Sequence, residues 1–78
     1  MSVAKTWKTT STRDIAYLVP KLRREAGLTQ AALAAKAGVS TRWLAALEAG
    51  KTSVDITLTY NVYKELGYTF TITARADD

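Results

Sequence analysis

The stretch that decides the fold is residues 27–51, GLTQAALAAKAGVSTRWLAALEAGK. It contains two short runs of strong helix formers, residues 30–37 and 41–49, separated only by Gly38, Val39 and a serine. A connection this short joins two helices at a steep angle, and Gly38 supplies the positive φ that the turn needs. Val39 is expected to plug the turn from the core side. The stretch therefore predicts two short helices joined by a tight turn.

Hydroxyl residues stand immediately before both helices. Thr29 and Ser40 can each accept a hydrogen bond from an orphan amide in the first helical turn, so we expect them to be N-caps. With leucines anchoring the pair inward, the start of the second helix points outward, and it carries Ser40, Thr41, Arg42 and Trp43. An exposed helix N-terminus with Ser, Thr and Arg side chains matches what a DNA major groove requires.

Upstream, apolar residues recur at three- and four-residue spacing, which predicts a helix that begins near Thr12 or Arg13 and ends at Gly27. Pro20 lies inside this helix, where it removes one backbone hydrogen bond. We expect either a kink near residues 16–19 or an interruption with Pro20 opening a second segment. The prediction for the whole chain is therefore an all-α domain of four or five helices.

Downstream, a further helix is expected to be capped by Ser53, with Asp55 in its first turn, and to end at Gly67. Its expected apolar face consists of Ile56, Tyr60, Tyr63 and Leu66.

The period changes after Gly67. Residues 68–73, YTFTIT, alternate apolar side chains with threonine, which predicts a β-strand. A single strand in a helical chain must pair with something. The N-terminal arm is one partner, but the same strand of a second copy, antiparallel across a two-fold axis, is the more economical one. We therefore expect Tyr68, Phe70 and Ile72 in a dimer interface.

Composition narrows the function. The chain has 78 residues, which is one domain, and it has neither Cys nor His. This composition argues against disulfides, thiolate chemistry and the common zinc sites, so we expect no metal, no cofactor and no enzyme activity. The net charge is +4, and it is uneven: residues 1–53 carry nine basic and three acidic side chains, whereas residues 54–78 carry two and four. A basic front half indicates a polyanionic partner.

The motif G-L-T-Q-x-x-L-A-x-x-x-G-V-S, followed by L-x-x-L-E-x-G-K, resembles the lambda-repressor-like, or Xre-type, helix-turn-helix family over roughly residues 12–67. Within that family, residues 39–44 (VSTRWL) and the strand after Gly67 resemble HipB-like antitoxins. Those proteins repress their own genes and bind kinase-type toxins, and their C-terminal strands pair between subunits. Pro20, in the first helix, departs from that pattern.

The resemblance implies roles for individual residues. Gln30 would bind a phosphate and brace the recognition helix, with backbone amides near Thr29 adding a second contact. Ser40, Thr41 and Arg42 would face bases and neighbouring phosphates, with Arg42 the best candidate for guanine. Trp43 would lie either along the sugar-phosphate backbone or half in the core, and Lys51 would hold the far phosphate. Arg23 and Glu48 would form a partly buried ion pair that fixes the recognition helix.

These expectations combine into one organisation. Residues 1–11 are a flexible basic arm, residues 12–67 a helix-turn-helix DNA-binding domain, and residues 68–78 a dimerisation strand and tail. The expected function is a dimeric autorepressor on a palindromic operator, as the antitoxin of a HipBA-like toxin–antitoxin pair in the bacterial cytoplasm, associated with the nucleoid when bound to DNA. The alternatives are a stand-alone phage- or Xre-type repressor and, in another class, a protein-interaction adaptor that does not bind DNA. No membrane partner is expected, because no apolar run approaches the ~20 residues of a membrane span and no signal peptide is visible.

Overall fold

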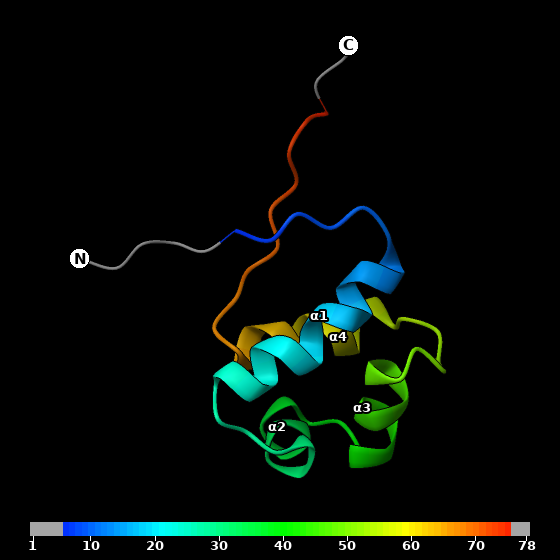
Figure 1. The fold of residues 1–78 in the computed structure, drawn as a ribbon, viewed down its shortest axis with the longest axis vertical. Helices are drawn as coiled ribbons and strands as arrows, with labels where there is room; N and C mark the ends of the chain where they lie inside the picture. Colours follow the sequence, from blue (N-terminus) through cyan, green and yellow to red (C-terminus); the bar gives the residue numbers. More distant parts are fainter. Residues whose placement is uncertain (1–5, 76–78) are drawn as a thin grey trace, which may run out of the picture.

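The computed structural model of the protein describes residues 6–75 and contains four α-helices in that range (Figure 1). They are α1 (Thr12–Glu25), α2 (Gln30–Ala37), α3 (Thr41–Glu48) and α4 (Ile56–Glu65). No strand forms among the described residues of the single chain. The predicted all-helical domain is therefore confirmed, with four helices and not five.

The first helix runs through its proline without a break. α1 continues from Thr12 to Glu25 across Pro20, so of the two predicted alternatives, a kink or an interruption, the interruption is wrong. Val19 and Leu22, on either side of Pro20, are 0% and 2% exposed. Their burial holds the helix together, while Pro20 removes a single backbone hydrogen bond from the middle of the ladder.

The start of α1 is closed by local hydrogen bonds. The Ser11 side chain is the N-cap and accepts from the Asp14 backbone N–H, while the Asp14 carboxylate accepts from the Thr10 N–H at 3.0 Å and from its hydroxyl at 2.9 Å. Hydrogen bonds from Thr10 lower the pKa of Asp14 below its ordinary value. At the other end, α1 stops at Glu25, two residues before the predicted Gly27, with Ala26 as its C-cap.

α4 departs from the prediction at its cap and at its buried face. Its N-cap is Asp55, which accepts from the Leu58 N–H at 3.1 Å, so the prediction of Ser53 is wrong. Thr59, Val62 and Tyr63 are the buried residues of the helix. Of the predicted apolar face, Tyr63 is buried and Leu66 packs against the core, whereas Ile56 in the first turn and Tyr60 are 65% and 48% exposed. Thr59 and Val62 are buried in their place.

The core is made by side chains from all four helices. Its fully buried large residues are Val19 of α1, Leu33 of α2, Leu44 and Leu47 of α3, and Thr59 and Val62 of α4. Tyr63 closes one edge, where its hydroxyl donates to the Ile15 carbonyl at 2.5 Å and where burial raises its pKa.

The two terminal segments leave the helices on the side away from α2 and α3 (Figure 1). They touch each other through Trp7, whose ring N–H donates to the Tyr68 hydroxyl at 3.4 Å. The Phe70 ring lies on α4, with centroids 5.0 Å from Tyr63 and 5.7 Å from Tyr60. The predicted strand is not formed in the single chain, and its pairing across a dimer stays a prediction. Residues 1–5 of the predicted arm and 76–78 of the predicted tail lie outside the described residues.

Candidate nucleic-acid interface

The helix-turn-helix unit is built by α2, the turn and α3. Thr29 is the N-cap of α2 and accepts from the Ala32 N–H at 3.0 Å. Ser40 is the N-cap of α3 and accepts from the Trp43 N–H at 2.9 Å. Between them Gly38 ends α2 at φ 71°, a left-handed conformation that a side chain would disfavour. Both caps and the turn glycine lie where the sequence predicts them.

The beginning of α3 faces solvent. Ser40, Thr41 and Arg42 are exposed, whereas Leu44 and Leu47 are completely buried. Trp43 is half-buried and packs against the core, which favours the packing role that the sequence left open for it. An arginine and two hydroxyl side chains are therefore free to approach a ligand from the leading turn of this helix.

A buried ion pair joins the first and third helices. Glu48 of α3 accepts from Nε of Arg23 at 2.7 Å and from Nη2 at 3.0 Å, and the two side chains are only 6% and 10% exposed. The remaining guanidinium nitrogen of Arg23, Nη1, donates to the Leu28 carbonyl at 3.0 Å. The guanidinium thus ties α1 to α3 and to the segment that leads into α2.

Gln30, the first residue of α2, completes this network. Its amide nitrogen donates to Oε1 of Glu48 at 3.0 Å. Burial alone would raise the pKa of Glu48, but the hydrogen bonds from Arg23 and Gln30 and the charges of Arg23 and Arg24 bring it below its ordinary value. The hydrogen bond to Glu48 raises the pKa of Arg23 in return. Both groups stay charged, and three helices are fixed to one carboxylate.

Other residues expected to form sites lie apart from this unit. Lys51 is exposed just after α3, in a loop anchored by a hydrogen bond from its N–H to the Ala46 carbonyl at 2.9 Å. Tyr68 and Phe70 contact their own chain, whereas the Ile72 side chain is fully exposed. None of the helices in residues 6–75 is long and apolar enough to cross a membrane.

Sequence reasoning missed two features near these sites. The Leu28 carbonyl accepts from the third guanidinium nitrogen of Arg23. A backbone carbonyl carries no side-chain signal, so this contact cannot be found from a motif. The position of Trp7, with Nζ of Lys21 5.3 Å from its ring centre, has no sequence signal either, because a single tryptophan in a polar arm gives no periodicity.

Comparison with known proteins agrees with this geometry. A family model described as a helix-turn-helix domain matches residues 18–66, which include the second half of α1 and all of α2, α3 and α4. A search of curated proteins returned no significant match. The chain therefore belongs to the helix-turn-helix domain family, which indicates a DNA-binding regulator.

Proposed function

We propose that this protein is a sequence-specific transcriptional regulator that inserts the leading turn of α3 into the major groove of DNA. The observation that carries the proposal is the exposure of Thr41 and Arg42 at the start of a helix whose orientation is fixed by a buried ion pair. A preorganised helix loses little freedom on binding, so its contacts contribute more to affinity.

Each exposed residue has a distinct role in this proposal. Arg42 can donate two hydrogen bonds to O6 and N7 of one guanine, which supplies about 1–3 kcal/mol of discrimination between bases. Ser40 and Thr41 contact bases or phosphates beside it. Phosphates on the two sides of the groove are held by Lys51 and by the start of α2, where Thr29 and Gln30 lie.

The test is fluorescence anisotropy with DNA from immediately upstream of the gene, titrated with salt. Wild type should bind with an affinity that falls steeply as salt rises, because phosphate contacts release counterions. Arg42→Ala should weaken operator binding by about 1–3 kcal/mol, whereas Lys64→Ala on α4 should leave it unchanged. If the protein is instead an interaction adaptor, no salt-dependent operator binding appears and Arg42→Ala has no effect.

We further propose that the protein acts as a two-fold dimer through residues 68–73. In the single chain these residues form no strand, so the segment has no ladder of backbone hydrogen bonds to another strand. Its backbone N–H and C=O groups could pair with the same segment of a second copy. The segment lies on the side away from α2 and α3, so pairing there leaves both recognition helices free (Figure 1). Two copies would then contact successive major grooves, about 34 Å apart, on a palindromic operator.

Ile72 gives the sharpest test of the dimer. Its side chain is 100% exposed, so Ile72→Asp removes no contact within one chain. Light scattering should show a monomer for Ile72→Asp and a dimer for wild type. Thr71→Asp adds the same charge on the opposite side of the alternation and should remain a dimer. A dimeric Ile72→Asp protein would exclude this strand from the interface.

The narrower role that we propose is a HipB-like antitoxin that represses its own operon and binds a kinase-type toxin, with no catalytic activity of its own. It is supported by the resemblance of residues 39–44 and of the C-terminal segment. Co-expression with the adjacent gene tests it: an antitoxin relieves the growth arrest caused by that gene product and co-purifies with it. A stand-alone phage- or Xre-type repressor binds the operator but relieves no arrest.

A further inference from the structure

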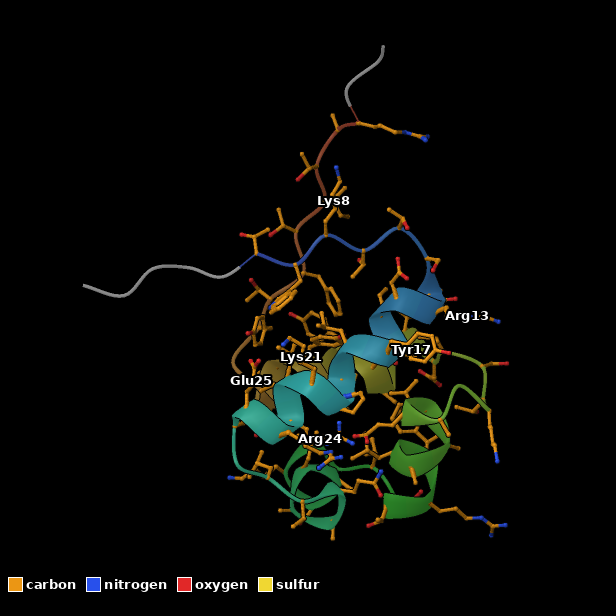
Figure 2. The ribbon with its side chains drawn as sticks, viewed as in Figure 1. Lys8, Arg13, Tyr17, Lys21, Arg24 and Glu25 are labelled. Atoms are coloured by element: carbon orange, nitrogen blue, oxygen red, sulfur yellow. The ribbon has the colours of Figure 1, made fainter. Side chains whose placement is uncertain are left out.

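Two consecutive arginines near the end of α1 have opposite surroundings. Arg23 is buried against Glu48, whereas Arg24 is exposed, because successive helical residues point about 100° apart. Figure 2 shows Arg24 on the side of α1 nearest α2 and α3, whereas Arg13 lies at the other end of the helix and Lys8 lies on the opposite side of α1, in the N-terminal segment. Arg24 therefore lies at the corner where α1 leads into the helix-turn-helix unit.

The guanidinium of Arg24 is charged and available. The ion pairs among residues 6–75 are Lys21 with Glu25 at 3.1 Å and Arg23 with Glu48, and Arg24 is in neither. Its charge is nevertheless felt at Glu48, where it adds to the effects of the hydrogen bonds in holding the pKa below the ordinary value. Its neighbour Arg23 donates to the Leu28 carbonyl in the segment that leads into α2, and Arg24 lies on the side of α1 toward α2 (Figure 2).

We propose that Arg24 binds a backbone phosphate of DNA at the corner between α1 and α2, so that the interface extends beyond the helix-turn-helix unit. The inference rests on the proposed function, in which a phosphate already lies at Thr29 and Gln30. A guanidinium carries five N–H donors in a planar fork, which fits phosphate oxygens. A phosphate contact carries no sequence information, so Arg24 contributes affinity and orientation but not base preference.

The exposed charge of Arg24 also has a purely structural explanation, which does not involve DNA. A basic residue in the last turn of a helix interacts favourably with the helix dipole whether or not DNA is present. The chain offers a matched control for that effect. Lys64 is also exposed, and it precedes the last residue of α4 as Arg24 precedes the last residue of α1, within the parallel sequences Arg24-Glu25-Ala26-Gly27 and Lys64-Glu65-Leu66-Gly67.

The experiment compares Arg24→Gln and Lys64→Gln in the full chain, by anisotropy against salt with the upstream duplex and with an unrelated duplex. Loss of one phosphate contact should reduce the log–log salt slope by about 0.9 and weaken binding about 5-fold at 0.15 M salt. Arg24→Gln should show this loss on both duplexes by the same factor, and Lys64→Gln on neither. Arg24→Lys should restore most of the slope, because it keeps the charge.

Three results would overturn the inference. If Arg24→Gln keeps the wild-type salt slope, Arg24 makes no phosphate contact. If Arg24→Gln and Lys64→Gln lose affinity equally, the loss reflects only the change of net charge. A loss confined to the upstream duplex would mean base recognition instead. Equal thermal midpoints for the two variants confirm that neither has lost its fold. Wild-type protein without salt-dependent binding would overturn the proposed function as well, whereas the first three results leave that function intact.

Discussion

Arg23 in α1 and Glu48 in α3, 25 positions apart, are joined by two hydrogen bonds, Nε to Oε2 at 2.7 Å and Nη2 to Oε1 at 3.0 Å. Arg23 also donates to the Leu28 carbonyl, and Glu48 also accepts from Gln30. The orientation of α3 is therefore set by a carboxylate at its last residue, at the opposite end from the exposed Thr41 and Arg42.

Removing one partner of this pair should cost more than removing both. Glu48→Ala leaves a guanidinium buried without its counter-charge, which costs about 3–5 kcal/mol. The double variant Arg23→Met, Glu48→Leu replaces both charges by apolar side chains of similar volume and should lie within about 1–2 kcal/mol of wild type. Urea unfolding followed by circular dichroism measures both. A double variant less stable than Glu48→Ala would contradict this account.

The same pair predicts how stability depends on acid. The pKa of Glu48 in the folded protein lies below its ordinary value of 4.5. Its contribution to stability is therefore fully present above that value and is lost as pH falls through the lower, folded pKa. When the free energy of unfolding is measured from pH 7 downward, it should fall as the pH drops below the ordinary pKa of 4.5 and approaches the lower pKa of folded Glu48. The fall should be smaller in Glu48→Gln, which has no carboxylate to protonate.

Asp14 should add to that acid sensitivity in the same direction, because hydrogen bonds from Thr10 lower its pKa too. Asp14→Asn should therefore remove a separate part of the slope. A Glu48→Gln protein with the full wild-type acid slope would show that the pair does not titrate as described.

The parts of the fold that local chemistry decides could be predicted from the sequence. The caps at Thr29 and Ser40 and the left-handed Gly38 follow from residue type and spacing alone, and the structure has all three. The exposed start of α3 follows in turn, since burying Leu44 and Leu47 leaves Thr41 and Arg42 outside.

The parts that depend on tertiary packing could not be predicted. Ile56 and Tyr60 fit helical spacing as well as the buried Thr59 and Val62 do. Only contact with the other helices decides that the polar Thr59 is buried and that Ile56 and Tyr60 are exposed. The pairing of Arg23 with Glu48 and the bracing role of Gln30 were predicted from a family resemblance and not from spacing. That Gln30 braces α3 by donating to Glu48 had no sequence signal of its own. Contact of these residues with DNA stays a prediction.

Pro20 should be replaceable with a gain in stability. It lies within a continuous α1, where it cannot donate to the Ala16 carbonyl. Pro20→Ala restores that hydrogen bond, and the gain should be about 2 kcal/mol once the greater freedom of the unfolded chain is subtracted. Pro20→Gly restores the same bond with a poorer helix former and should gain less. Thermal unfolding ranks the three proteins, and a less stable Pro20→Ala protein would mean that ring packing outweighs the lost bond.

The N-cap of α4 is Asp55 in the structure, whereas the sequence predicts Ser53. Asp55 accepts from the Leu58 N–H, so Asp55→Ala leaves one amide of the first turn without its partner and should cost about 1 kcal/mol. Asp55→Asn keeps an acceptor oxygen and should lose much less. Ser53 is exposed and does not cap the helix, so Ser53→Ala should stay within about 0.5 kcal/mol of wild type. Calorimetry on the three variants decides between the caps, because a helix that began at Ser53 would reverse the order of the two alanine variants.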